Sequence, residues 1–222
     1  MTLELPMTVE LPASPAVCST DLLCGIRELQ GLELKLELKR AKATMLTNHY
    51  THLLPNGKSH WLAYGPAIVV WSIPANYTIG AYLLGEPCNV WELSRLWAPD
   101  GHEKNLLTQA VSAAVKWIAK AEKPDVLVSY ADPNAGHRGG IYRAASWTYQ
   151  GQSEESRNYE APNGQRVARR AFHSGGNSMT KAQIEAGGFR EVRLPGKHRY
   201  VKPLTRKARK MLEARLPHNT PS

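Results

Sequence analysis

Two side chains that can handle a proton lie ten residues apart in the second half of the chain. Asp132 directly follows residues 125–130, a short apolar run that we expect to be a buried strand. Open α/β arrangements place ligands at the carboxyl end of such a strand, although an Asp before Pro133 and Asn134 is equally typical of a turn. Tyr142 falls in an expected helix, where it could donate a proton, shape a pocket or pack in the core.

Two histidines offer a second kind of chemistry. His49 and His52 share a face if their segment is helical, and with a carboxylate such as Asp132 they could bind a metal. Two histidines do not complete a metal site by themselves. The three cysteines have a spacing that suits neither a disulfide framework nor a closed zinc site, so we expect buried or unreactive thiols.

A turn between an expected strand and the most regular helix could hold phosphate. Residues 99–101 are Pro-Asp-Gly, and the residues at the start of the expected helix are Gly101, His102, Lys104 and Asn105. Free backbone N–H groups and the helix dipole favour an anion at such a position. A plain strand-to-helix turn explains the segment equally well, because a single glycine is a weak signal.

The charge distribution points to a polyanionic partner. The net charge is +9 and the pI is about 9.5. Residues 190–222 contain ten Lys or Arg and two acidic residues, whereas residues 1–26 contain three acidic residues and no Lys or Arg. We therefore expect a polyanionic partner such as nucleic acid, although many basic proteins bind none. The residues predicted to bind it are Arg166, Arg169, Arg170, Lys197, Arg199, Lys202, Arg206 and Lys207.

The hydrophobic pattern indicates which elements position these residues. Period-two alternation or β-branched and aromatic runs predict strands at 32–38, 60–71, 78–84, 90–97 and 125–130, and a further strand from Thr148. Helical spacing predicts helices at about 40–45, 104–121 and 137–147, and Thr180 with Gln183 forms a capping box before a short helix. This order predicts an α+β domain with a mixed, mostly antiparallel central sheet flanked by helices.

The same pattern divides the chain into an irregular N-terminal arm (1–26), a catalytic domain (27–203) and a basic C-terminal tail (204–222). The longest stretch without Lys, Arg, Asp or Glu, 59–85, is interrupted by Pro and Gly, so we expect strands there and no membrane span. No basic residue precedes Arg27, which argues against a signal peptide and for the cytoplasm. The oligomeric state stays open, a homodimer included.

Several short segments between about residues 40 and 203 carry a resemblance to a known family. They are Asn48-His49-Tyr50, Glu92-Leu-Ser-Arg-Leu-Trp97, Ser129-Tyr-Ala-Asp132, Gly136-His137, Gly140-Ile-Tyr142, Trp147 and Lys197-His-Arg-Tyr200. Together they resemble the phage Mom DNA-modification family. The resemblance implies a GNAT (N-acetyltransferase)-like fold. It also implies conversion of the N6 amine of adenine in phage DNA to a carbamoylmethyl (acetamido) amine, which protects the DNA from host restriction.

The resemblance also implies roles for particular residues and cofactors. The candidate catalytic residues are Asp132, Tyr142, Arg95 and Tyr64, and the candidate iron ligands are His49 and Tyr50. Acetyl-CoA would contact Leu96, Trp97, Gly101, His102, Lys104 and Asn105. The usual Gln/Arg-x-x-Gly-x-Gly/Ala phosphate turn of acetyltransferases is missing, because Gly101 is the only glycine in that turn. The partner that the resemblance implies is double-stranded DNA, contacted by the basic residues named above, with the target adenine flipped out of the duplex.

Two other functions fit the same sequence. An ordinary acetyltransferase acting on a protein or small-molecule amine would use the same fold, since fold does not fix the substrate. A non-catalytic DNA-binding protein would need only the basic C-terminal segment. The chemistry of the implied product is a further constraint, because simple acyl transfer leaves a carbonyl on N6 whereas the product joins nitrogen to a methylene carbon.

Overall fold

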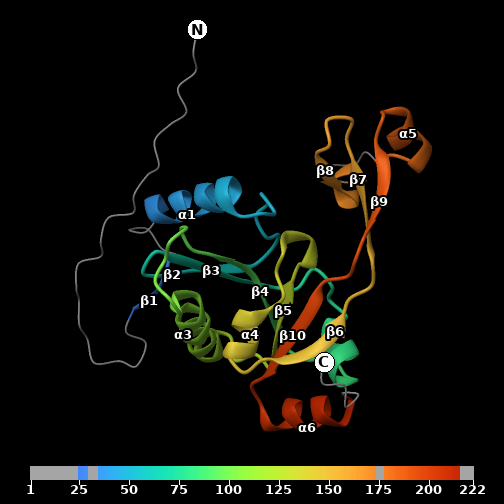
Figure 1. Cartoon of the computed structure of the whole chain (residues 1–222). Helices are drawn as coiled ribbons and strands as arrows, with labels where there is room; N and C mark the ends of the chain where they lie inside the picture. The colour runs from blue at the N-terminus through green and yellow to red at the C-terminus, as the bar shows by residue number, and fades with distance from the viewer. Residues whose placement is uncertain (1–24, 30–34, 174–177, 216–222) are drawn as a thin grey trace.

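A seven-stranded sheet forms the centre of the protein, and a three-stranded sheet stands apart from it (Figure 1). The computed structural model describes residues 25–29, 35–173 and 178–215. The large sheet has the order β1 (Ile26–Glu28), β2 (Ser59–Tyr64), β3 (Ala67–Ser72), β4 (Val90–Trp97), β5 (Val126–Ala131), β10 (His198–Pro203) and β6 (Thr148–Gln152). The small sheet has the order β8 (Arg166–Ala168), β7 (Ser156–Glu160) and β9 (Arg190–Leu194).

Helices cover both faces of the large sheet. They are α1 (Lys35–Asn48), α2 (Ile79–Leu84), α3 (Leu106–Ala121), α4 (Gly140–Ala144) and α6 (Arg206–Arg215), with the 3-10 turn η1 (Pro133–Ala135) after β5. The helix α5 (Lys181–Ala186) and the 3-10 turn η2 (Arg169–His173) contact the small sheet instead. The fold is therefore α+β, as the sequence predicts, and the arrangement agrees with the fold class that the resemblance implies.

The alternation of side chains along the strands explains the two layers. In β3, Val69 and Trp71 pack beneath α3, whereas Ile68 and Val70 pack on the other face against α1. At the other end of the sheet, Val126 and Val128 of β5 contact α2 and α6. Figure 1 shows α3 and α4 on one face, with α1 and α6 at opposite ends of the other.

One pair of strands is parallel, and its ladder is short. The β4–β5 ladder runs from Val90 opposite Val126 to Leu93 opposite Ser129, and all other described strand pairs are antiparallel. Beyond Leu93, β4 continues to Trp97 beside β3, while β5 continues to Ala131 beside β10. The two strands therefore separate at their carboxyl ends, with α3 as the crossover between them.

The helix predicted at 104–121 is confirmed as α3, and its buried residues recur at helical spacing: Leu106, Ala110, Val111, Ala114, Val115 and Ile118. The strand predicted at 90–97 is β4. The capping box is confirmed as well, since Thr180 and Gln183 bond each other's backbone N–H groups at the start of α5.

Two predicted strands are wrong, because both segments are helical. Residues 35–38 of the strand predicted at 32–38 begin α1, and residues 32–34 lie outside the described part. Helix-forming Leu, Glu, Lys and Ala outweigh the alternation, and α1 buries Ala41 and Met45 while Leu36 stays 59 % exposed. The strand predicted at 78–84 is α2, which buries Leu83 and Leu84 and ends at Gly85 with a positive φ of 84°.

Two predicted boundaries also change. The helix predicted at 137–147 is reduced to α4, because Gly139 (φ 71°) and Ser146 (φ 59°) turn the chain at either end. The predicted basic tail from residue 204 is not a free tail, since α6 buries Ala208 and Leu212 against the sheet. Residues 1–24 of the predicted arm and residues 216–222 lie outside the described part.

His60 joins β1, β2 and α3 through two hydrogen bonds. Its Nδ1 lies 2.7 Å from a carboxylate oxygen of Glu28, and its Nε2 lies 2.7 Å from one of Glu122. The ring also packs between Trp91 and Trp117, with centroids 5.0 Å from both. The His60 side chain therefore connects the edge strand β1 and the end of helix α3 to strand β2.

Replacing His60 with Ala should lower the free energy of unfolding by about 1–3 kcal/mol, because two partly buried carboxylates lose a partner at once. Urea denaturation measures this. His102→Ala, at an exposed position, is the control and should change stability by no more than about 0.5 kcal/mol. Equal stability of the two variants would contradict the role given to His60.

Candidate active site

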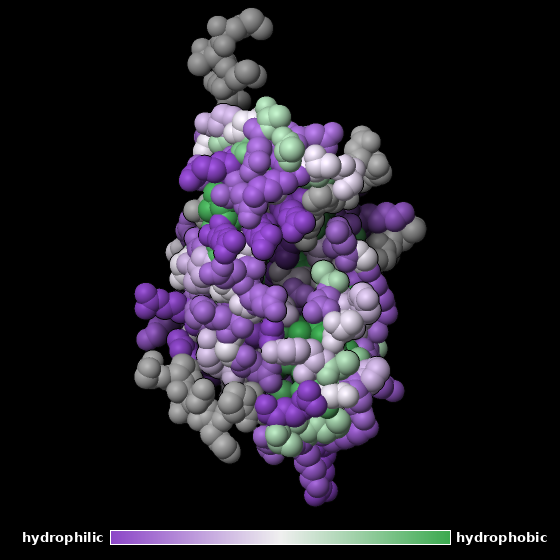
Figure 2. Space-filling model, turned by 90° about the vertical axis from the view of Figure 1, so that its right-hand side faces the viewer, coloured by the Kyte–Doolittle hydropathy of each residue, from purple (hydrophilic) through white to green (hydrophobic). Residues whose placement is uncertain are grey.

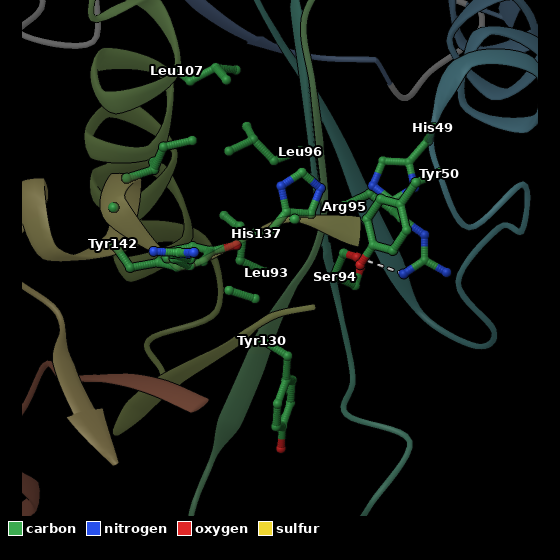
Figure 3. Close-up of a pocket in the computed structure, with 16 residues that line it drawn as sticks. His49, Tyr50, Leu93, Ser94, Arg95, Leu96, Leu107, Tyr130, His137 and Tyr142 are labelled. Atoms are coloured by element: carbon green, nitrogen blue, oxygen red, sulfur yellow. Dashed lines mark hydrogen bonds between the residues drawn. The ribbon is translucent and has the colours of Figure 1, made fainter. Parts of the chain in front are cut away.

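A cavity of about 300 Å³ occupies the gap where β4 and β5 separate (Figure 3). We call it the first cavity. One wall is residues 93–96 of β4 with Leu107 of α3, and the other is residues 130–131 of β5 with residues 136–142 of the loop and α4. His49 and Tyr50, which follow α1, close the remaining side. The gap in the sheet thus becomes a site lined by both apolar and polar side chains.

Tyr142 lies in this cavity at the end of a short hydrogen-bond chain. Ser129 Oγ is 2.8 Å from the carbonyl oxygen of Leu93 and 2.8 Å from the Tyr142 hydroxyl. A carbonyl only accepts, so the single hydroxyl proton of Ser129 goes to Leu93, and Tyr142 must donate to Ser129. Burial raises the pKa of Tyr142 to about 12, which keeps the phenol neutral. Its oxygen can still accept a hydrogen bond from a molecule in the cavity.

Tyr50 stands between two histidines on the opposite side of the first cavity. Its ring centroid is 4.5 Å from that of His49 and 5.1 Å from that of His137. Burial and the nearby Asp132 raise the pKa of Tyr50 to about 12, and Arg95 opposes them. Burial, followed by the positive charge of Arg95, lowers the pKa of His49 to about 4. Both rings are therefore neutral at neutral pH.

Arg95 reaches the rim of the first cavity from β4. Its Nε donates to the carbonyl of Leu53 at 3.0 Å, and its Nη1 donates to the carbonyl of Ser94 at 2.6 Å (Figure 3). These bonds fix the guanidinium at the cavity wall. The structure therefore brings Arg95, Tyr142, His49 and Tyr50 together, as a single site requires.

Asp132 sits beside the first cavity and its carboxylate is fully engaged. Oδ1 accepts from the backbone N–H and the side-chain amide of Asn134, both at 3.0 Å, and Oδ2 pairs with Lys197 Nζ at 2.9 Å. Burial would raise the pKa of Asp132, but the hydrogen bonds from Lys197 and Asn134 outweigh it and hold the pKa below its ordinary value. This carboxylate is a weak base that fixes Lys197.

The other candidate residues are spread more widely. Tyr64 ends β2 and packs against the core, and it does not line the first cavity. Leu96 lines the first cavity, whereas Trp97 packs against the cluster beneath α1. The turn residues Gly101, His102, Lys104 and Asn105 are all exposed before α3.

The predicted iron ligands do not assemble a metal site. Within the described residues, no group of three or more His, Cys, Asp or Glu side chains is placed to hold an ion. His49 Nδ1 is 2.8 Å from the Thr51 hydroxyl, and His52 Nδ1 is 2.9 Å from the Leu46 carbonyl. His49 and His52 do not share a helical face either, because α1 ends at Asn48. The residues present do not fit iron, and we derive no step through it.

The predicted DNA-binding residues fall into three groups. Arg169, Arg206 and Lys207 are exposed. The second group is held by the fold: Lys197 pairs with Asp132, Lys202 Nζ donates to the carbonyl of Ala145 at 2.9 Å, and Arg199 is buried, only 8 % exposed. The side chains of Arg166 and Arg170 lie outside the described part. DNA binding by this set stays a prediction.

A second cavity, of about 570 Å³, lies next to the first and shares Tyr130 with it. It is lined by the loop and first turns of α2 (74–82) and by residues 195–199, with Glu92 and Tyr130 projecting from the sheet. Gln152, Ser153, Glu154 and Ser156 complete the lining. Glu92 and Tyr130 were not predicted from the sequence as site residues. The signal was present, since Glu92 is a lone carboxylate inside an apolar strand.

The bend that admits Tyr142 to the first cavity depends on Gly139. This residue has a φ of 71°, and a Cβ there would lie 2.1 Å from the Tyr200 ring. Gly140, one residue on, has no atom within 4 Å of its equivalent Cβ position.

We expect Gly139→Ala to lower the free energy of unfolding by at least about 2 kcal/mol, through backbone strain and a clash with a buried ring. Gly140→Ala is the matched control and should be neutral or slightly stabilising, because Ala is favoured over Gly in a helix. Thermal or urea denaturation compares the two. Equal effects would mean that this bend is not fixed as described.

Comparison with known proteins agrees with the resemblance noted in the sequence. The chain is 26 % identical over 196 residues to the methylcarbamoylase mom of Escherichia phage Mu, covering 79 % of this chain and 76 % of that protein. Among solved structures, an acetyltransferase from Bacillus subtilis in complex with CoA has a TM-score of 0.42 and 13 % identity, covering 81 % of this chain and 98 % of that one. The ribosomal-protein-S5-alanine acetyltransferase of Vibrio fischeri has a TM-score of 0.36 and 8 % identity, covering 76 % and 67 %.

No helix in the described part of the chain is long and apolar enough to cross a membrane.

The model of the Mom protein family matches residues 35–222, a range that contains every residue lining the first cavity. This chain therefore belongs to the Mom protein family.

Proposed function

We propose that this protein is a DNA-modifying transferase of phage DNA. It converts the N6 amine of adenine to a carbamoylmethyl amine and thereby protects the DNA from host restriction. The similar phage Mu protein is named a methylcarbamoylase, which is the first support. The observation that carries the proposal is the pair of neighbouring cavities that share Tyr130 in their linings, because a transferase must hold a donor and an acceptor side by side.

The first cavity suits the donor. Leu93, Leu96 and Leu107 supply an apolar wall for an acyl chain, and the exposed turn before α3 offers Lys104 near the helix N-terminus for phosphate groups. Acetyl-CoA is the donor cofactor that these residues would hold, and it would supply a two-carbon unit. Tyr142 would accept a hydrogen bond from an N–H group of the bound donor, such as an amide of the coenzyme A arm, because its own proton is committed to Ser129.

Asp132 acts in this proposal as a positioning residue. Its engaged oxygens and lowered pKa make it unsuited to take a proton from adenine. Its contact with Lys197 instead holds an ammonium group at the edge of both sites, 6.0 Å above the Tyr50 ring. The methylene carbon of the product excludes simple acyl transfer as the complete reaction. The roles given to these residues are therefore limited to binding and orientation.

The exposed face of α6 is the proposed contact to the DNA backbone. Arg206, Arg209 and Lys210 project from this helix, while Lys207 is paired with Glu86. Binding through these residues is electrostatic, so affinity should fall steeply with salt.

Nucleoside mass spectrometry tests the activity. Plasmid DNA from cells that briefly express the protein should contain a heavier deoxyadenosine whose mass corresponds to a carbamoylmethyl group. Tyr142→Phe should reduce its rate of appearance roughly tenfold, through the loss of one hydrogen bond in the first cavity. Tyr159→Phe, a buried tyrosine of the small sheet, is the matched control and should modify DNA normally.

Other outcomes would contradict the proposal in different ways. An added mass corresponding to acetyl would indicate an ordinary acetyltransferase reaction on DNA. Unmodified DNA together with consumption of acetyl-CoA by a free amine would indicate an acetyltransferase with another substrate. Unmodified DNA together with tight, salt-sensitive DNA binding would indicate a binding protein.

The salt dependence of duplex binding tests the contact surface. Replacing Arg206, Arg209 and Lys210 with Gln should make the slope of log affinity against log salt shallower by up to about 3, because three phosphate contacts are lost. The matched control replaces the exposed Lys35, Lys39 and Arg40 of α1, at the other end of the sheet (Figure 1). Equal slopes for the two triple variants would place the DNA contact elsewhere.

A further inference from the structure

The second cavity contains an arginine whose bonding is incomplete. Arg199 is 8 % exposed, and its Nε has no hydrogen-bond partner. Its guanidinium carbon lies 4.8 Å from the ring centroid of Tyr82 and 5.9 Å from that of Tyr130. A buried N–H without a partner is costly. This donor therefore points to a ligand with a hydrogen-bond acceptor.

The same cavity contains a carboxylate, Glu92, that lacks an ion-pair partner within 4 Å among the described residues. Glu92 projects from β4 into the cavity. Burial raises the pKa of Glu92, although the charges of Arg95 and Lys197 oppose this effect. A carboxylate only accepts hydrogen bonds when it is ionised. Because burial disfavours the ionised form, a ligand N–H group such as an amine would stabilise this carboxylate by donating to it.

The volume of the cavity and the exposed ring at its border suit a flat, aromatic ligand. Its volume of about 570 Å³ falls within the usual range for small-molecule sites, about 300–1,000 Å³. Tyr82 is 61 % exposed and borders the cavity, so one ring face is available for stacking. Figure 2, which views the right-hand side of Figure 1, shows a mainly hydrophilic face with a hollow near its centre. DNA can approach such a surface without a large apolar barrier.

We propose that the second cavity receives the flipped adenine, with Glu92 accepting a hydrogen bond from its N6 amine and Arg199 donating to a ring nitrogen. Adenine has this pattern of donor and acceptor on one edge. Because Tyr130 lines both cavities, a base held here would lie next to a donor in the first cavity. This assignment rests on the proposed function and specifies which cavity and which residues select the base.

The test uses a short duplex with one mispaired adenine, which flips at low cost in any sequence context. A 2-aminopurine beside it brightens when the neighbouring base leaves the stack, so titration gives the affinity for the flipped state. A second duplex carries hypoxanthine in place of the adenine. Hypoxanthine presents a carbonyl where adenine has the amine, and that oxygen would face the Glu92 carboxylate.

The wild-type protein should prefer adenine over hypoxanthine by about tenfold or more. Glu92→Gln should abolish this preference, because an amide can donate to the carbonyl as well as accept from the amine. Tyr82→Leu should lower the affinity for the flipped state roughly tenfold for both bases, because a stacking surface is lost. This exposed ring can be replaced without disturbing the core. Glu155→Gln, an exposed carboxylate outside the cavity, is the matched control and should behave as the wild type does.

A Glu92→Gln protein that keeps both the preference for adenine and full DNA modification would overturn the assignment while leaving the proposed function intact. A wild-type protein that neither unstacks adenine nor modifies DNA would overturn both. Loss of the preference in Glu92→Gln, with normal behaviour of Glu155→Gln, would establish Glu92 as the residue that reads the amine.

Discussion

The separation of β4 from β5 after Leu93 and Ser129 is the constraint on which the rest of the site depends. Up to that point the two strands are joined by a parallel ladder, and beyond it each is paired only with its outer neighbour. Ser129 marks the point of separation and bonds both the Leu93 carbonyl and Tyr142. The gap is therefore lined by fixed polar groups in an otherwise apolar sheet, which is the environment in which oriented hydrogen bonds discriminate most strongly.

The two cavities divide the work of a transfer reaction between them. The first has apolar residues of β4 and α3 on one side and neutral aromatic rings on the other, whereas the second holds a carboxylate, a buried arginine and an exposed tyrosine ring. Lys197 lies at their boundary and is fixed by Asp132. The account therefore assigns Asp132 a structural role, and it gives the recognition of the amine to Glu92.

Local patterns predicted much of the fold, and long-range contacts account for most of the errors. The apolar spacing of α3 and the alternation of β4 were sufficient because each element buries one face against the sheet. In α1 the alternation of leucines favoured a strand, but helix propensity together with the burial of Ala41 and Met45 outweighs it. Glu92 was not predicted as a site residue, also because of a long-range contact. Its neighbour in the second cavity, Arg199, comes from β10, more than a hundred residues away, and no local pattern links them.

The central claim is that donor and acceptor occupy separate cavities that meet at Tyr130. The most direct test is an experimental structure of the protein bound to a duplex that contains one mispaired adenine. The account predicts the base outside the helix, in the second cavity, with its amine against Glu92 and the first cavity left free for the donor. A base that remains stacked in the duplex, or one that occupies the first cavity beside Tyr142, would contradict it.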